Sequence, residues 1–234
     1  MEKGVVSSSV VKRLPRYYRF LDELNNQGVD KISSRELSEK MSVTASQIRQ
    51  DLNCFGDFGQ QGYGYNIPML VREIGEILGV NKGFKTVIIG AGNLGKAIAN
   101  HMDFEAKGCE LIGIFDVNKN IIGTKTGNLT VQDESELEEF CRENKPKIAV
   151  LCIPREVAKS VAEKLVNLGV TAFWNYSHYD LQMDFDKIIV ENVHLGDSLL
   201  TLSYRVNNND ARKIKKKIII KPKPSKTAKS KTKK

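Results

Sequence analysis

The stretch TVIIGAGNLGKAI at residues 86–98 decides the fold. A β-branched apolar run meets three glycines spaced G-x-G-x-x-G, and a second apolar stretch follows. Gly90 is expected to permit a tight turn, Gly92 to let backbone amides approach a pyrophosphate, and Gly95 to let helix and strand pack closely. The N-terminus of the following helix can then stabilise the phosphates. The stretch therefore predicts the opening strand, turn and helix of a dinucleotide-binding domain.

An acidic residue follows at the distance that such a domain requires. The apolar stretch ELIGIFD at residues 110–116 ends at Asp116, twenty-one residues past Gly95. A carboxylate there can accept hydrogen bonds from the ribose hydroxyls and would repel the 2′-phosphate of NADP. Val117 is not an arginine that could accommodate that phosphate. We therefore expect NAD(H) as the cofactor, with a glycine-rich turn beside an unrelated aspartate as the alternative.

Strand and helix patterns alternate through the second half of the chain. Strands are predicted at 85–90, 110–115, 147–153, 170–174 and 187–191, and helices at 93–101, 135–144, 155–168 and 196–207. This alternation predicts a parallel sheet joined by right-handed crossovers.

The first eighty residues show a different pattern. An amphipathic helix is predicted in LPRYYRFLDELNNQG at 14–28, and two capping boxes, Ser33-x-x-Glu36 and Thr44-x-x-Gln47, open two short helices. Two short helices joined by a tight turn form a helix-turn-helix. The segment FGDFGQQGYGYN at 55–66 alternates aromatic residues with glycines and suits a hairpin. We therefore predict a winged helix-turn-helix.

One face of the second capped helix carries residue types that read nucleic acid. Its exposed side is expected to present Ser46, Gln47, Arg49, Gln50 and Asn53. Arginine, glutamine and asparagine side chains hydrogen-bond base edges in the major groove. The alternative is a solvated helix face with no partner.

The composition narrows the classes of protein to which the chain can belong. The apolar fraction is 41% and the mean hydropathy is −0.33, with no apolar run of the ~20 residues that span a bilayer. The N-terminus shows no signal-peptide pattern, and the four cysteines show no C-x-x-C spacing. We therefore expect a cytoplasmic protein with reduced thiols, no membrane contact and no metal.

The net charge of +8 comes from the end of the chain. Residues 211–234 hold twelve Lys and Arg and no acid, which leaves 24 basic against 28 acidic residues and a formal charge of −4 for residues 1–210. Residues 1–80 hold ten of each sign. So basic and repetitive a tail is expected to be disordered and to attract nucleic acid, or else to be a solvated extension.

The motifs together resemble one family. RLPRYYRFLDEL, SSRELSEKMSVTASQIRQDL, FGDFGQQGYGYNI, IIGAGNLGKAI, IFDVN, CIPREVA and WNY occur in the order found in the Rex family of redox-sensing transcriptional repressors. The resemblance covers residues ~11–207 and implies an α/β chain. Its parts would be a winged helix at 1–80, a Rossmann NAD(H)-binding domain at 81–194, a swapped dimerisation helix at 195–208 and a basic tail at 209–234.

The resemblance implies a sensor that binds operator double-stranded DNA as a homodimer with NAD⁺ or without ligand, and is released by NADH. Cofactor contacts are expected at Gly90, Ala91, Gly92, Asn93, Leu94, Gly95, Lys96, Asp116, Val117, Ile153, Pro154, Asn175 and Tyr176. DNA contacts are expected at Arg13, Arg16, Thr44, Ser46, Gln47, Arg49, Gln50, Asn53, Gln60, Gln61 and Tyr63. Leu195, Leu199, Leu202 and Val206 form one face of the dimerisation helix.

The chain departs from the family at its switch. Arg19 is retained, but His101 stands where the family carries a tyrosine and His194 where it carries an aspartate. His178 and His194 have no evident partner in the sequence, and no Tyr-x-x-x-Lys follows the glycines, so we do not expect an enzyme. A paralogue that binds DNA with a weak redox response, or less favourably a small NAD-dependent dehydrogenase, remains the alternative.

Overall fold

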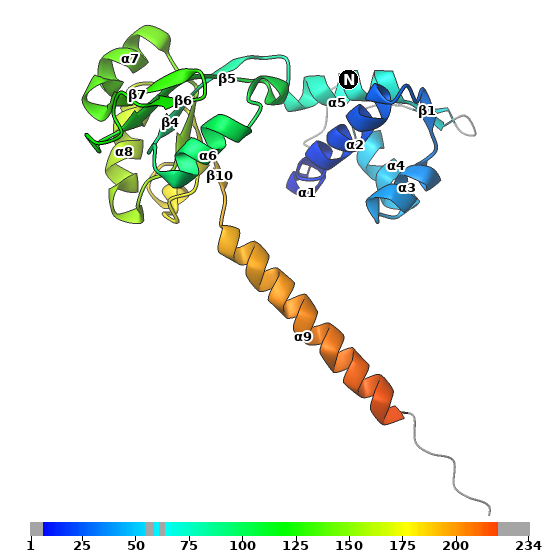
Figure 1. Ribbon diagram of the computed structural model, residues 1–234. Helices are drawn as coiled ribbons and strands as arrows, with labels where there is room; N and C mark the ends of the chain where they lie inside the picture. Colours follow the sequence, from blue (N-terminus) through cyan, green and yellow to red (C-terminus); the bar gives the residue numbers. More distant parts are fainter. Residues whose placement is uncertain (1–6, 55–58, 61–63, 220–234) are drawn as a thin grey trace, which may run out of the picture.

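The computed structural model describes residues 7–54, 59–60 and 64–219, which form two bodies and one long C-terminal helix (Figure 1). The predicted wing residues Gln61 and Tyr63 lie outside the described residues, as does the side chain of Gln60. Within the described ranges, no helix is long and apolar enough to cross a membrane.

The first body is a helix-turn-helix with a small sheet. Its helices are α1 (Ser8–Val11), α2 (Leu14–Asn26), α3 (Ser34–Met41), α4 (Ala45–Asn53) and α5 (Ile67–Leu78). Its strands β1 (Lys31–Ile32), β2 (Gly59–Gln60) and β3 (Gly64–Asn66) pair antiparallel in the order β1-β3-β2. Because β2 and β3 form the predicted hairpin beside α3 and α4, the winged-helix prediction is confirmed.

The turn between α3 and α4 follows from local caps, although one predicted cap is incomplete. Ser33 and Glu36 form the predicted capping box at the start of α3. Thr44 accepts the backbone N–H of Gln47, but the Gln47 side chain bonds elsewhere, so the second capping box is only half formed. Ser42 ends α3 in the left-handed conformation with φ 53°, which turns the chain sharply into α4.

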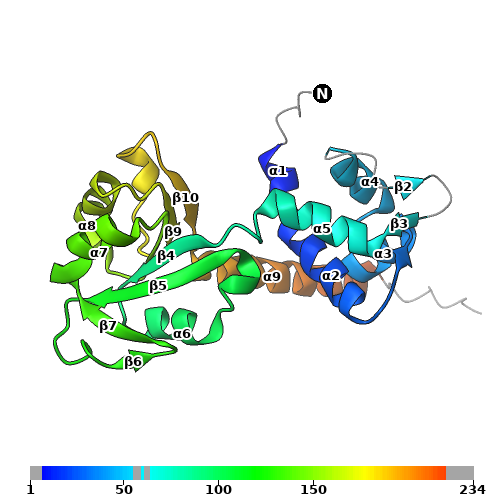
Figure 2. The same ribbon diagram turned by 90° about the horizontal axis from the view of Figure 1, so that it is seen from above.

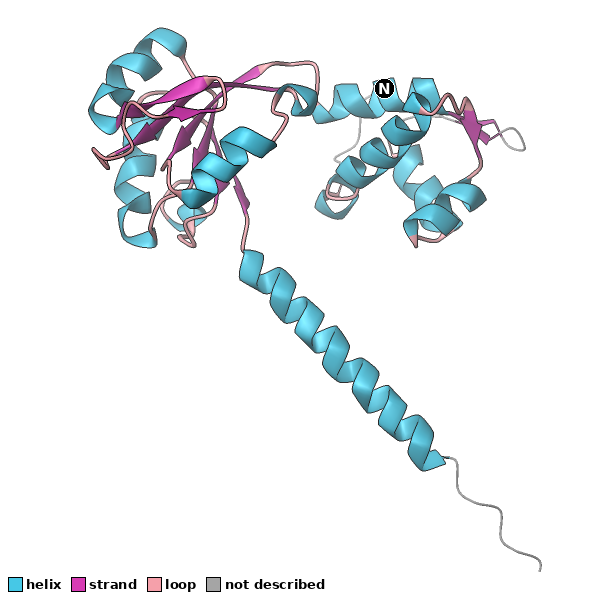
Figure 3. Cartoon of the chain, in the orientation of Figure 1, coloured by secondary structure: helices cyan, strands magenta, loops and turns pink. Residues whose placement is uncertain are grey.

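The second body is a seven-stranded sheet with helices on both faces (Figure 3). Its strands are β4 (Phe84–Ile89), β5 (Cys109–Asp116), β6 (Lys125–Thr126), β7 (Leu129–Asp133), β8 (Ile148–Leu151), β9 (Ala172–Asn175) and β10 (Ile189–Asn192). The order is β10-β9-β8-β4-β5-β7-β6 and every pair is parallel except β6 with β7. The predicted parallel sheet is confirmed, whereas β6 and β7 were not predicted.

The helices of this body cover the two faces unequally. They are α6 (Asn93–His101), α7 (Leu137–Asn144) and α8 (Arg155–Asn167), with short 3-10 turns η1 (Glu105–Lys107), η2 (Glu134–Glu136) and η3 (Leu181–Met183). Side chains of α7 and α8 share a buried cluster with β4, β8 and β9. The opposite face carries a cavity of about 440 Å³ lined by apolar residues that include Val150, Trp174 and Ile189.

The last helix, α9 (Leu195–Ile219), leaves the sheet after β10 and extends away from both bodies (Figure 1). The predicted dimerisation helix ended at residue 208 and the predicted disordered tail began at 209. The structure corrects that boundary, because the helix continues through residues 209–219. In Figure 1 its first turn follows the loop after β10, and the rest of the helix runs away from the sheet. Figure 2 shows the same helix from above.

Candidate functional site

The glycine-rich loop follows β4, the central strand of the sheet. Gly90 has φ +95°, and a Cβ there would lie 2.4 Å from the Cys152 carbonyl oxygen. A Cβ on Gly95 would lie 1.9 Å from the carbonyl oxygen of Gly90. The expected roles of Gly90 in a tight turn and of Gly95 in close helix–strand packing are therefore confirmed, because neither position admits a side chain.

Gly92 differs, since a Cβ there would meet no atom of the protein within 4 Å beyond the adjoining residues of the chain. It is the N-cap of α6, and no side chain caps that helix. Asn93 and Leu94 in the first turn are exposed. The open space therefore meets uncapped backbone N–H groups, an arrangement that suits an anionic diphosphate. A dinucleotide fits the residues present here.

Asp116 lies at the end of β5, beside the loop. Its Oδ2 accepts the backbone N–H of Ala91 at 2.6 Å, and its Oδ1 accepts that of Asn118 at 2.8 Å. The side chain of Val117 is 70% exposed. The carboxylate thus faces the glycine-rich loop, where a ribose joined to the diphosphate would lie.

Strand order fixes where the far half of a dinucleotide would lie. β5 lies on one side of β4 and β8 on the other, so the order of the strands reverses at Gly90 and Cys152. Ligands of open parallel sheets bind at such a switch point. Ile153 is half-buried and Pro154 exposed at the end of β8, beside this point.

Two further predicted cofactor residues follow β9. Burial raises the pKa of Tyr176 to about 12, so its hydroxyl stays protonated at neutral pH. Asn175 is fully buried, and its amide donates to the Tyr179 carbonyl and to Asn192 Oδ1. The Asn175 side chain therefore lies in the core, and a contact of Asn175 with the cofactor stays a prediction.

In the first body, α4 presents the predicted reading face. Ser46, Arg49, Gln50 and Asn53 are exposed, whereas Gln47 is half-buried. Arg49 Nη1 donates to the hydroxyl of Ser34 at 2.9 Å, which holds the guanidinium near the start of α3.

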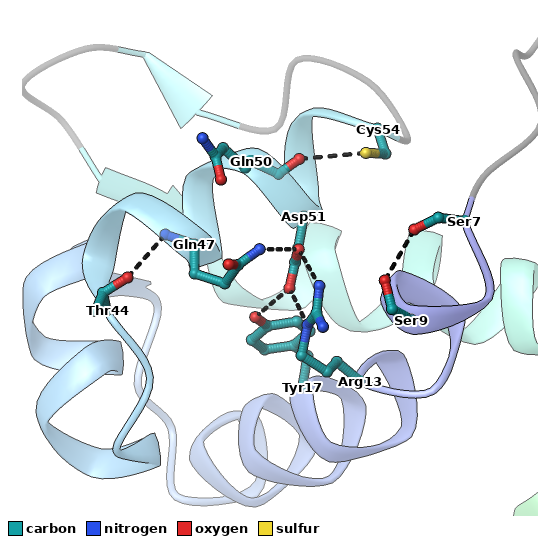
Figure 4. A network of polar contacts seen from close by, with 9 residues as sticks. All are labelled: Ser7, Ser9, Arg13, Tyr17, Thr44, Gln47, Gln50, Asp51 and Cys54. Carbon is teal, nitrogen blue, oxygen red and sulfur yellow. Dashed lines mark hydrogen bonds and ion pairs between the residues drawn. The ribbon is translucent and has the colours of Figure 1, made fainter.

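Asp51, on the inner side of α4, was not predicted as a site residue. It is 1% exposed and accepts hydrogen bonds from Arg13, Tyr17 and Gln47 (Figure 4). Arg13 and Gln47 were predicted to contact DNA, but the structure turns their polar groups toward Asp51. The available signal was a charged residue placed between the buried positions Ile48 and Leu52.

The proposed switch residues are not joined in this chain. Arg19 and His101 are exposed, and within the described ranges no hydrogen bond connects either with His194. Instead His194 Nδ1 lies 3.0 Å from His178 Nδ1, with the two rings stacked at 17°. The two histidines, for which the sequence shows no evident partner, thus lie against each other. Arg16, another predicted DNA contact, donates to the Met41 carbonyl at 2.5 Å.

Two family models match the chain. The model described as "Putative DNA-binding protein N-terminus" matches residues 5–53, and the CoA binding domain model matches residues 81–179. These ranges lie over the helix-turn-helix and over the sheet with its glycine-rich loop.

Curated relatives are named Redox-sensing transcriptional repressor Rex. The protein of Thermoanaerobacter sp. (strain X514) is 54% identical over 89% of this chain and 93% of its own length. That of Clostridium perfringens (strain 13 / Type A) is 51% identical over 90% of this chain and 99% of its own length.

Solved structures of the repressor RSP are similar to this chain over most of its length. The repressor RSP in complex with β-NAD⁺ and operator DNA has a TM-score of 0.81 at 53% identity, covering 91% of this chain and 97% of that one. RSP in complex with β-NADH has a TM-score of 0.80 at 50% identity, covering 89% and 98%.

Proposed function

The chain belongs to the Rex family of redox-sensing transcriptional repressors, and on this premise we propose that it binds operator DNA through α4 and the wing and leaves it when NADH binds the second body. RSP, its relative of known structure, has been seen with β-NAD⁺ on operator DNA and with β-NADH. Because the proposed partner is operator DNA, we propose that the protein acts in the cytoplasm.

One observation carries the proposal. The open space at Gly92, the uncapped N-terminus of α6 and the Asp116 carboxylate together form a dinucleotide cradle in a chain that also presents a helix-turn-helix. A bound dinucleotide needs no catalytic acid or base to act as a signal. We therefore propose a sensing role and not a catalytic one, in keeping with relatives that are named as repressors.

The test is a titration of operator affinity against the NADH/NAD⁺ ratio with the full chain. A sensor loses operator affinity as NADH replaces NAD⁺, whereas a repressor without a redox response holds the same affinity at every ratio. The His194–His178 pair makes this measurement informative, because His194 cannot form the carboxylate–arginine pair that an aspartate could. Steady consumption of NADH with a carbonyl substrate would instead identify an enzyme.

We also propose a homodimer, in which α9 packs against a second copy. Large apolar side chains of α9 are more than half exposed in the single chain: Leu195, Leu199, Leu200, Leu202, Tyr204 and Val206. An apolar stripe of this length seldom stays in water. The apolar cavity over β8, β9 and β10 offers further surface for the partner to cover.

Replacing Leu199 with lysine tests the dimer. The charge would lie in the middle of the apolar stripe, so Leu199→Lys should give monomers in sedimentation at micromolar concentration, where the parent chain is a dimer. Thr201→Lys, on the polar side of α9, is the matched control and should stay dimeric. A monomeric parent chain would contradict the proposal.

A further inference from the structure

The first body holds a buried carboxylate with an unusual number of donors. Arg13 donates Nε to Asp51 Oδ2 at 2.6 Å and Nη2 to Oδ1 at 2.7 Å. The Tyr17 hydroxyl donates to Oδ2 at 2.7 Å, and Gln47 Nε2 to Oδ1 at 2.8 Å (Figure 4). One side chain of α4 therefore joins the start of α2 to the reading helix.

The hydrogen bonds to Asp51 stabilise the negative charge of its carboxylate. Burial raises the pKa of the Asp51 carboxyl, but the hydrogen bonds from Arg13, Tyr17 and Gln47 together outweigh burial and hold the pKa below its ordinary value. Asp51 is therefore an anion at neutral pH. Its two oxygens accept four donors, which fixes the orientation of each donor.

The contact with Asp51 uses only some of the N–H donors of Arg13. A guanidinium has five N–H donors in a rigid fork, and Asp51 uses two of them. The Arg13 side chain is 33% exposed, whereas Asp51 is 1% exposed. The outer N–H groups of Arg13 are thus left on the surface of the helix-turn-helix, held in one direction by a partner that water does not reach.

We propose that Asp51 is a positioning residue for DNA binding: it holds Arg13 so that the outer N–H groups of the guanidinium meet a phosphate of the operator. The proposal rests on the proposed function, because it names how one residue of the DNA-binding body reaches its partner. A held guanidinium loses little conformational entropy on contacting phosphate, whereas a free arginine must be ordered.

A purely electrostatic role and a positioning role of Asp51 predict opposite effects of Asp51→Asn on operator affinity. The substitution removes a negative charge and adds +1 to the DNA-binding body, so a purely electrostatic role raises affinity for all DNA. Positioning instead lowers operator affinity, and we expect a fall of about tenfold with NADH affinity unchanged. A higher or equal operator affinity for Asp51→Asn overturns the proposal.

Arg13→Lys keeps the test open if Asp51→Asn does not fold. Lysine preserves the net charge but cannot form the two-pronged contact with Asp51. Operator affinity of Arg13→Lys should fall by a similar factor. Where Asp51→Asn folds, the double variant Asp51→Asn/Arg13→Lys should lose no more than either single variant, since both remove the same contact. Unchanged affinity of Arg13→Lys, or additive losses in the double variant, would sink the idea.

Leu24→Ala controls for instability. Leu24 lies in the same core with no polar group in its side chain, so the variant should melt at a lower temperature yet bind operator as the parent does. If Leu24→Ala also loses operator affinity, the effect of Asp51 is general destabilisation and the positioning role is wrong. Failure of the parent chain to bind operator in the same assay would refute the proposed function instead.

Discussion

Asp116 serves the glycine-rich loop as well as the proposed ribose site. Its Oδ2 accepts the N–H of Ala91, the residue between Gly90 and Gly92, at 2.6 Å. Its Oδ1 accepts the N–H of Asn118 at 2.8 Å, which shapes the turn after β5. One carboxylate thus orders both loops that would flank a bound dinucleotide.

Asp116→Ala should weaken NADH binding and narrow the difference between NADH and NADPH. The variant removes charged hydrogen bonds to the ribose, each worth about 1.5–3 kcal/mol, and releases the N–H of Ala91. Isothermal calorimetry measures both affinities. Glu110→Ala, at the exposed opposite end of β5, is the control and should bind as the parent does. Equal NADH affinity in Asp116→Ala would show that the site lies elsewhere.

Arg49→Ala should lower operator affinity by about 1–3 kcal/mol and leave NADH affinity intact. The guanidinium is exposed on α4 and tethered to Ser34, so it can reach a guanine or a phosphate. A gel-shift assay at fixed salt gives the comparison. Arg35→Ala removes an equal charge from the exposed side of α3 and is expected to cost far less. Similar losses in the two variants would mean that only net charge matters.

The partner of Asp51 could not be predicted from the sequence. Arg13 and Asp51 are 38 residues apart, and neither residue has a sequence neighbour that signals the pairing. Gln47 has the spacing of a capping box with Thr44, but Asp51 lies one turn further along α4 and offers its amide a charged acceptor. A charged partner gives the stronger hydrogen bond, so the local rule failed there.

Helix α6 runs over the predicted residues, Asn93–His101, because its start at the glycines is a strong local signal. The hairpin of β6 and β7 was missed for the opposite reason. β6 has only two residues, Lys125 and Thr126, and so short a strand shows no alternation of apolar and polar positions.

The continuation of α9 beyond residue 208 was not predicted, because the high density of positive charge indicated disorder. Lysine also has good helix propensity, and the helix continues to Ile219.

The contact between α2 and α4 should depend on pH through Asp51. The folded carboxyl has a lowered pKa, so its stabilisation is fully present above the unfolded value of about 3.9 and is lost as the pH falls through the lower folded value. At neutral pH Asp51→Asn should cost about 1–3 kcal/mol. Thermal unfolding from about pH 6 to about pH 3 should show the parent converging on the variant. Parallel curves would contradict the charged state of Asp51.

The whole chain combines a neutral DNA-binding body with a strongly basic end. Residues 1–80 hold ten basic and ten acidic residues, and residues 211–234 hold twelve basic residues and no acid. The Clostridium perfringens relative is covered over 99% of its length by 211 residues of this chain. That leaves 23 of the 234 residues of this chain outside the alignment.

Truncation after residue 210 should lower affinity for random and operator DNA by similar factors, since contacts between basic side chains and phosphates add affinity without reading base edges. The slope of log K against log salt should flatten, and NADH affinity should not change. Truncation after residue 219 keeps α9 with five of the twelve cations. If the number of cations sets the salt dependence of DNA affinity, this variant has a slope of log K against log salt between those of the parent and the shorter variant. If both truncations bind with the slope and affinity of the parent, the basic end does not contact DNA.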